Sequence, residues 1–287
     1  MRKLALAAVA GALFLAGCGS GSTGSTSTTS SGAPSGGGKV QVLYAASLAN
    51  LMEHDLGPAF DKSSGDTFNG TAAGSTQLVS EIKGKVKVAD VFVSASTDAN
   101  NGLMGAANGN WESWYATFGS SPLVIGYNPK SKFANDLKTK PWQQVITESG
   151  FRMGTTDPKL DPKGKLAAQA LSKENVPSSA AQVFPEEQLV GRLQAGQLDA
   201  GFFYSSEAAD LNIPTIRLSS LNLKATYTVS VLDNAPDQSQ AIAFVQYLLG
   251  SDGQGLMKKH GLQLQPVKVT GDTTKVPSQL DSVLGVK

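Results

Sequence analysis

Hydrophobic and polar positions follow two periods from residue 39 to residue 287. Short apolar runs typical of buried strands alternate with stretches in which apolar residues recur every three or four positions, as on one face of a helix. The pattern predicts strands at 40–44, 66–71, 89–95, 122–127, 151–154, 200–204 and 226–232. It predicts helices after an N-cap at Ser47, after Gly74-Ser75, and at 142–146, 165–171, 186–194 and 242–249. This alternation predicts an α/β fold with largely parallel sheets.

The N-terminal segment departs from this pattern. Residues 1–17 begin with two basic residues and continue as an apolar run that is too short to span a bilayer but suits a secretory signal. The run ends in the tetrapeptide LAGC, which resembles the bacterial lipoprotein signal and implies that Cys18 is lipidated and becomes the new N-terminus. The alternative is an ordinary cleaved signal followed by an incidental cysteine.

Residues 18–38 are rich in Gly, Ser and Thr, a composition that cannot bury apolar surface and behaves as a flexible tether. We therefore expect the folded part to cover residues 39–287. A lipid on Cys18 and this tether together predict an extracytoplasmic protein anchored to the bacterial cell membrane, on the periplasmic side or at the cell surface.

Composition narrows the function classes. The net charge of +1 argues against a nucleic-acid binder, which carries a basic excess. One cysteine and two histidines exclude an internal disulfide framework and any Cys-based zinc site, and leave little for a His-rich one. The Gly-x-Ser-x-Gly elbow and the Gly-rich phosphate-binding loop are both missing from the sequence, so we expect no enzyme, although a hydrolase stays an alternative.

Three predicted strand-to-helix junctions begin with a small hydroxyl residue or a Pro/Gly turn: Ser47, Gly74-Ser75 and residues 161–164. A helix N-terminus presents unpaired N–H groups and a positive partial charge, so several that meet in one crevice can bind an anion. In α/β sheets this crevice lies beyond the carboxyl ends of the strands. Taken singly, each serine could simply cap its helix.

The ordered set of motifs resembles the molybdate/tungstate-binding proteins that serve ABC importers, especially the tungstate-type branch. The resemblance is carried by residues 44–48 (YAASL), 73–75 (AGS), 89–95 (ADVFVSA), 123–127 (LVIGY), 156–162 (TDPKLDP) and 196–204 (GQLDAGFFY). It implies a two-lobed clamp like that of periplasmic binding proteins, with two hinge crossings near 118–122 and 225–229. The first lobe would comprise residues 39–118 plus 228–287, and the second lobe residues 119–227.

The resemblance also implies a ligand site between the lobes. Ser47 and Ser75 match two serines that bind the oxyanion from the first lobe, and Tyr204 matches a tyrosine that donates from the second. In the tungstate branch, Asp161 and Glu186 match carboxylates that are ligands to the metal of the oxyanion. An alignment with a one-residue gap would select Glu187 in place of Glu186.

Carboxylates beside an anion need a physical reason, because two like charges about 4 Å apart repel by several kcal/mol at intermediate dielectric. Sulfur in sulfate cannot accept further oxygen ligands, whereas molybdenum and tungsten can, so acids suit only the latter. The alternative is that Asp161 supports a turn and Glu186 favours its helix N-terminus. Lys163 stands where the family often has a cysteine, and we expect it at the mouth of the site or in solvent.

The resemblance thus predicts a solute-binding lipoprotein that captures molybdate or tungstate, uses no other cofactor, works as a monomer and delivers its ligand to an ABC permease. A sulfate or phosphate binder of the same fold stays open as an alternative. So does a surface lipoprotein that binds no small molecule.

Overall fold

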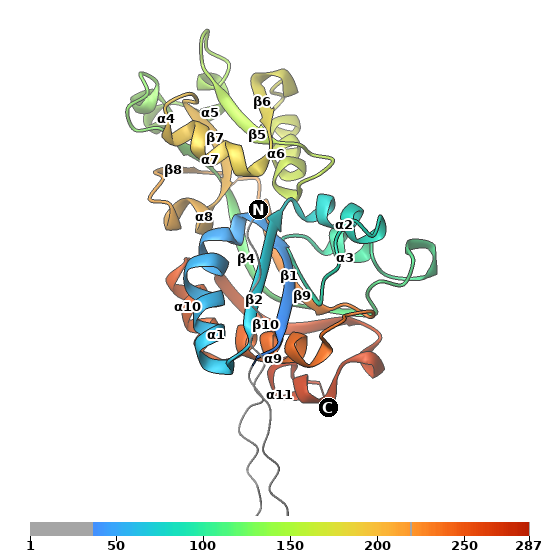
Figure 1. Cartoon of the computed structure of the whole chain (residues 1–287). Helices are drawn as coiled ribbons and strands as arrows, with labels where there is room; N and C mark the ends of the chain where they lie inside the picture. The colour runs from blue at the N-terminus through green and yellow to red at the C-terminus, as the bar shows by residue number, and fades with distance from the viewer. Residues whose placement is uncertain (1–36, 219, 287) are drawn as a thin grey trace, which may run out of the picture. The chain divides into compact units, whose positions relative to one another are not determined.

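Strand β4 (Trp114–Tyr127) runs through both sheets of the fold. The structure is a computed structural model that describes residues 37–218 and 220–286, and these belong to one compact unit. The first part of β4 pairs with β9 (Lys224–Val231) as far as Pro122, and from Leu123 onward it pairs with β7 (Ala200–Tyr204). The strand therefore changes partners between Pro122 and Leu123, which joins the two sheets (Figure 1).

One sheet contains β9, the first part of β4 and four further strands, and we call it and its helices lobe one. Those strands are β1 (Lys39–Ala45), β2 (Thr67–Ala73), β3 (Val91–Ser94) and β10 (Gln263–Gly271). Its helices are α1 (Gly57–Ser64), α2 (Ser75–Lys83), α3 (Thr97–Asn101), α9 (Gln238–Leu249), α10 (Ser251–Lys259) and α11 (Asp281–Leu284). Shorter helical segments are η1 (Ala46–Leu48), η2 (Leu51–Leu56), η3 (Ala106–Asn108), η5 (Thr273–Lys275) and η6 (Ser278–Leu280).

The other sheet contains β7 and the last part of β4, and with its helices it forms lobe two. Its remaining strands are β5 (Met153–Thr156), β6 (Ala181–Phe184) and β8 (Thr215–Arg217). Its helices are α4 (Ala134–Thr139), α5 (Trp142–Val145), α6 (Pro162–Lys173), η4 (Ser178–Ala180), α7 (Glu186–Gln194) and α8 (Ser205–Asp210). The two-lobed α/β architecture confirms the predicted fold class, while the predicted lobe boundaries stay predictions.

Strand direction differs from the prediction of largely parallel sheets. The strands β1, β2 and β3 pair in parallel, as do β5, β6 and β7. All pairings of β4 and β9 are antiparallel. The two strands run in opposite directions beside each other at the junction of the sheets. The alternation of strands and helices therefore revealed the parallel parts of both sheets but not these connecting strands.

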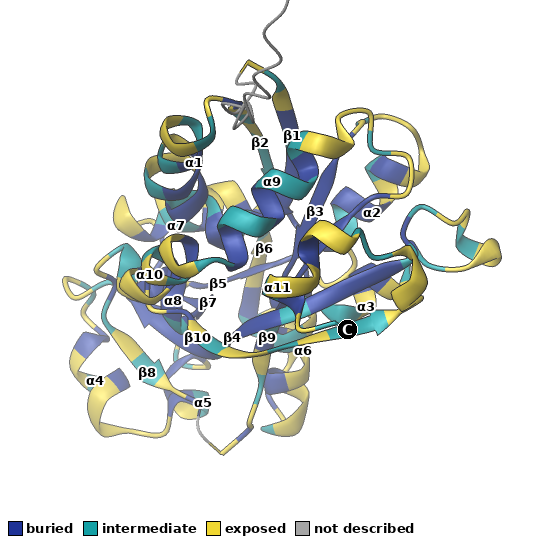
Figure 2. Ribbon diagram, turned by 90° about the horizontal axis from the view of Figure 1, so that it is seen from below, coloured by how far each residue is buried: buried dark blue, intermediate teal, exposed yellow. Residues whose placement is uncertain are grey.

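The core forms where the strands are covered on both faces. In β1, Val40 and Val42 to Ala45 are all buried, the near-continuous apolar run expected of a covered parallel strand. Helix α9 packs against this strand, and Phe244 of α9 meets Phe60 of α1 edge-to-face at 5.3 Å between ring centroids. Figure 2 shows the strands mainly in the buried colour with helices around them.

Helix starts position the candidate site, and one differs from the prediction. Ser47 is not an N-cap: it lies inside η1, because the turn begins directly after β1 and its cap residue is Ala45, whose methyl group cannot make a cap hydrogen bond. Ser75 is the first residue of α2 after Gly74. Asp161 caps α6, since its carboxylate accepts a hydrogen bond of 2.8 Å from the Lys163 N–H.

The predicted leader at 1–17, Cys18 and all but the last two residues of the predicted tether lie outside the described residues. Within 37–218 and 220–286, no helix has both the length and the apolar character that crossing a membrane requires.

Candidate functional site

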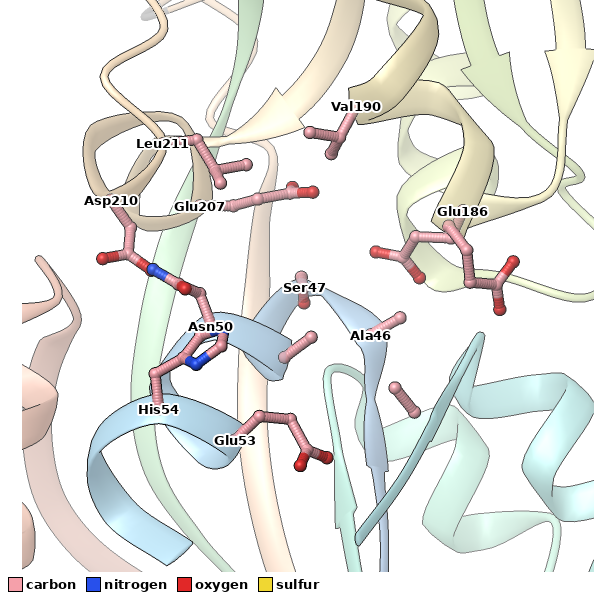
Figure 3. A pocket seen from close by; sticks show the side chains of 13 residues that line it. Ala46, Ser47, Asn50, Glu53, His54, Glu186, Val190, Glu207, Asp210 and Leu211 are labelled. Carbon is pink, nitrogen blue, oxygen red and sulfur yellow. The ribbon is translucent and has the colours of Figure 1, made fainter. Parts of the chain in front are cut away.

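Two cavities adjoin one another between the lobes, and both are lined by Glu186 and Glu187. The first, of about 350 Å³, lies between η1 and η2 of lobe one and α7 and α8 of lobe two. Figure 3 shows Ser47 on one side of this cavity and the carboxylates of Glu186 and Glu207 on the other. The second, of about 330 Å³, is lined by residues of α2 and of the segment from Thr156 to Asp161. Of the predicted site residues, Ser47 and Glu186 line the first cavity, and Asp161 and Glu186 line the second, whereas Ser75 and Tyr204 line neither.

Lobe one contributes hydroxyl groups. Further polar side chains of this lobe also line the first cavity: Asn50, and Glu53 and His54 of η2. Ser47 follows β1, and its Oγ lies 3.4 Å from the hydroxyl oxygen of Tyr227. Ser75 is 1% exposed, and its Oγ accepts a hydrogen bond of 3.1 Å from the Ala95 N–H. Because that contact uses the oxygen as an acceptor, the Ser75 O–H is left free to donate.

Lobe two contains four buried polar atoms that have no hydrogen-bond partner within the described part of the chain: Thr156 Oγ1, Asp161 Oδ2, the Tyr204 hydroxyl and Arg192 Nε. Thr156 and Asp161 line the second cavity, whereas Arg192 lines neither cavity. Leaving such an atom unpaired costs about 1–3 kcal/mol, so native proteins seldom bury several together without a ligand. Burial, and next the charge of Asp161, raise the pKa of Tyr204, which keeps its hydroxyl protonated and able to donate. The cluster suits a ligand whose oxygen atoms accept hydrogen bonds and whose central atom can bind a carboxylate oxygen.

Asp161 and Glu186 are close neighbours in this cluster. Asp161 is 5% exposed and Glu186 is 8% exposed, whereas Glu187 is exposed to solvent. Burial raises the pKa of Glu186, and the charge of Asp161 raises it further, despite the opposing effect of Lys163. The exposure of Glu187 favours Glu186 as the second carboxylate, although the assignment of both acids as ligands stays a prediction.

Lys163 lies in the interior and not at the mouth, so the expectation of a solvated or mouth-lining lysine is wrong. Its side chain is 0% exposed, and its Nζ donates to Glu186 Oε1 at 2.9 Å and to both carboxylate oxygens of Glu207 at 3.0 Å. Burial lowers the pKa of Lys163, but the charges of Glu186 and Glu207 outweigh it, and the net shift is upward. The first turn of α6 directs this ammonium inward because α6 begins at Pro162 against β5 and β7.

Sequence reasoning missed Glu207, Thr156 and Tyr227. Glu207 follows Tyr204 by three positions on α8, and its carboxylate also accepts from the Tyr204 N–H at 3.3 Å. A strand that ends at Tyr204, followed three residues later by an acid, is a pattern typical of a helix start. This pattern could have located α8 in the sequence. Thr156 and Tyr227 carry no such signal, because each looks like an ordinary strand residue until the fold brings it to the cleft.

Contacts between the lobes flank the cleft on several sides. The Gln77 N–H of α2 donates to the Leu160 carbonyl at 2.9 Å. Asn50 Nδ2 donates to Asp210 Oδ2 at 2.6 Å, and Lys165 Nζ lies 2.5 Å from Asp98 Oδ2. The two lobes therefore meet around the candidate site, as a clamp closed on a small ligand does.

Residues 40–263 match the family model of the bacterial extracellular solute-binding protein. The chain belongs to this family. Its members bind solutes outside the cytoplasm, which agrees with the expected extracytoplasmic location and with a role in binding.

Two relatives and one solved structure show what this solute-binding protein is similar to. It is 24% identical to the "Molybdate/tungstate-binding protein WtpA" of Thermococcus kodakarensis over 358 aligned positions, covering 100% of this chain and 98% of that protein. It is 25% identical to an "Uncharacterized solute-binding protein" of Petrotoga mobilis over 270 positions, covering 78% of this chain and 83% of that one. The structure of the periplasmic molybdate-binding protein of Azotobacter vinelandii superposes with a TM-score of 0.66 at 15% identity, over 79% of this chain and 99% of that chain.

The charge pattern of this solute-binding protein limits what the cleft can hold. Among the residues that the structure describes, no group of three or more His, Cys, Asp or Glu side chains is arranged to hold a metal ion. Asp161 and Glu186 can together supply a pair of oxygen ligands, which suits a centre that already carries oxygen atoms of its own. The hydroxyls of Ser47, Ser75 and Tyr204 can donate hydrogen bonds to those atoms.

Proposed function

We propose that this solute-binding protein captures molybdate or tungstate in the cleft between its lobes and delivers it to an ABC permease. The observation that carries the proposal is the cluster of unpartnered buried polar atoms on Thr156, Asp161 and Tyr204. Thr156 and Asp161 line the second cavity together with Gly74, the residue before Ser75, and Ser47 lines the adjoining first cavity. A relative named for molybdate and tungstate matches the whole length of this chain, which supports the same ligand class.

The acids select the oxyanion in this proposal. Asp161 is buried beside the carboxyl group of Glu186, and a buried carboxylate repels an anion that only accepts hydrogen bonds. Molybdenum and tungsten accept additional oxygen ligands, so Asp161 and Glu186 coordinate the metal while hydroxyl groups bind the oxo atoms. Sulfate and phosphate gain nothing from the acids, and we expect them to bind weakly.

The anchor is proposed from the sequence. Cys18 carries a lipid that holds the protein at the extracytoplasmic face of the membrane, and the segment between it and Lys39 is the tether. Each monomer then presents its ligand-loaded clamp to the permease. Replacing Cys18 by Ser should release the protein into the soluble fraction and leave the dissociation constants unchanged, which fractionation and calorimetry would measure. Loss of binding in the released protein would contradict this role.

Titration calorimetry of residues 39–287 with tungstate, molybdate and sulfate tests the function. We expect saturable binding of tungstate and molybdate with one site per chain, and at least about 100-fold weaker binding of sulfate, which corresponds to about 2.8 kcal/mol. Preference for sulfate or phosphate would instead support the alternative binder of the same fold. Absence of binding to all these anions would overturn the proposal.

A further inference from the structure

Lys163 places a buried positive charge directly behind the acids of the cleft. Its ammonium contacts Glu186 Oε1 at 2.9 Å and both oxygens of Glu207 at 3.0 Å, and its side chain is fully buried. Glu207 is held from the other side by the Tyr204 N–H. Lys163 is itself absent from the residues that line the two cavities. The ammonium therefore acts on a ligand through the carboxylates and not by touching it.

Without Lys163, the charged groups around the cleft would disfavour binding of a dianion. The carboxyl groups of Asp161, Glu186 and Glu207 gather on lobe two, all of them buried. Within the described residues, neither cavity is lined by a lysine or an arginine. A buried charge needs a partner, and a cluster of like charges with none repels an anion strongly.

We propose that Lys163 is a specificity-determining residue that serves as a fixed counter-cation of the anion site. It neutralises Glu207 and holds Glu186 by one oxygen, so that the other oxygen of Glu186 and the free oxygen of Asp161 face the ligand. This inference rests on the proposed function and deepens it. The negative charge of the acids strengthens binding when they coordinate a metal centre. The same charge weakens binding of an anion that is held by hydrogen bonds alone. The charge of Lys163 therefore matters more for sulfate than for tungstate.

The test measures tungstate, molybdate and sulfate binding to the full chain with four variants. Lys163→Met keeps the length of the side chain and removes its charge, and we expect sulfate to bind on the order of 100-fold more weakly. Molybdate and tungstate should both lose less affinity than sulfate, because the acids coordinate their metal. Lys159→Met, an exposed lysine four positions earlier, is the matched control and should change nothing.

Two further variants separate charge from packing. The double variant Lys163→Met with Glu207→Gln removes one charge of each sign, and binding should return to within about tenfold of the unmodified protein. Glu207→Gln alone leaves the ammonium less compensated and should strengthen sulfate binding several-fold. This last variant keeps the proposal testable if Lys163→Met does not fold.

The outcomes distinguish the inference from the function on which it rests. If the unmodified chain binds no oxyanion, the proposed function fails and the inference fails with it. If the chain binds but Lys163→Met does not change the affinities, the inference alone is overturned. The same holds if the double variant stays as weak as Lys163→Met, or if Glu207→Gln weakens sulfate binding, because the lysine would then act as a packing element and not as a counter-charge.

Discussion

The two lobes line the same cleft with different chemistry. Lobe one offers the hydroxyls of Ser47 and Ser75, both placed where a strand passes into a helix. Lobe two offers Tyr204 together with a buried network of Asp161, Lys163, Glu186 and Glu207. Hydroxyls at helix starts can donate hydrogen bonds to any oxyanion, whereas carboxylates discriminate between central atoms that can and cannot be coordinated. Under the proposed function, the hydroxyls of lobe one recognise the anion and the acids of lobe two select it.

The strongest test of this division replaces the acids of lobe two. Asp161→Asn and Glu186→Gln keep the shape and remove the charge, and an amide oxygen is a poorer ligand to a high-valent metal. We expect tungstate and molybdate to bind at least roughly 100-fold more weakly, a loss of about 2.8 kcal/mol. Sulfate should bind equally well or better, since a repulsive charge is gone. Calorimetry with each anion measures this crossing of effects, with Glu187→Gln as the exposed control.

A parallel loss for tungstate and sulfate in Asp161→Asn would contradict the selective role of lobe two. It would indicate that Asp161 serves only the N-terminus of α6, where it accepts from the Lys163 N–H.

The next test concerns the hydroxyls of lobe one. Ser75→Ala and Ser47→Ala each remove a donor to a charged acceptor, worth about 1.5–3 kcal/mol, so all oxyanions should bind about 10- to 150-fold more weakly. The loss should be similar for tungstate and sulfate, unlike the effect of the acids. Calorimetry combined with thermal unfolding of the unliganded protein checks this. If stability falls while the affinity of the folded protein holds, these serines are structural only.

Lobe one also has a buried acid, Glu112, which lines neither cavity. It therefore allows the effect of a buried acid on stability to be separated from an effect on ligand binding. Burial raises the pKa of Glu112 to about 8, while Asn100 donates to its Oε1 at 2.8 Å. The folded protein therefore keeps a proton that the unfolded chain loses above about 4.5. Between these values the free energy of unfolding should decrease as the pH rises, by up to about 1.4 kcal/mol per pH unit from this one group.

Glu112→Gln should flatten that dependence, as measured by chemical denaturation from pH 4.5 to pH 8. Oxyanion affinity should not change, because this acid does not line either cavity. An unchanged pH slope in Glu112→Gln would show that the residue is ionised when folded, and altered affinity would show that lobe one also takes part in selection.

The smallest effect is expected from contacts between the lobes. Asn50→Ala removes the hydrogen bond to Asp210, which joins the two lobes at the edge of the first cavity. Affinity for every oxyanion should fall by the same factor, about 3- to 10-fold, because closure costs more free energy whatever is bound. Unequal losses between tungstate and sulfate would mean that Asn50 contributes to selection.

The sequence pattern predicted the elements with strong periodicity and missed those defined by partners far away in the chain. Helix α7 and strand β7 have the bounds predicted, Glu186–Gln194 and Ala200–Tyr204, because each has a clear start and a regular apolar pattern. Strand β4 is 14 residues long, more than twice the length of the predicted segment 122–127. Its first part forms a strand only because it pairs with β9 and β10. Strand β10 has exposed and partly exposed residues but no buried one, and its sequence lacks the continuous apolar run that predicts a buried strand.

The candidate site shows the same limit. Motif order pointed to Ser47, Ser75, Asp161, Glu186 and Tyr204. Three of them, Ser47, Asp161 and Glu186, line the two cavities, and the roles of all five stay predictions. It did not predict that Lys163 is buried, because a lysine after a proline at a helix start is usually solvated. Only the position of α7 and α8, which deliver Glu186 and Glu207 to its ammonium, makes burial of that charge possible.

X-ray absorption spectroscopy of the tungstate complex tests the central claim most directly, since it counts the oxygen atoms around the metal. If lobe two selects through coordination, the metal in the unmodified protein has more oxygen neighbours than free tungstate, and Asp161→Asn lowers that number. An oxygen count equal to that of free tungstate, together with undiminished binding by Asp161→Asn, would contradict the account and leave the hydroxyls of Ser47, Ser75 and Tyr204 as the site.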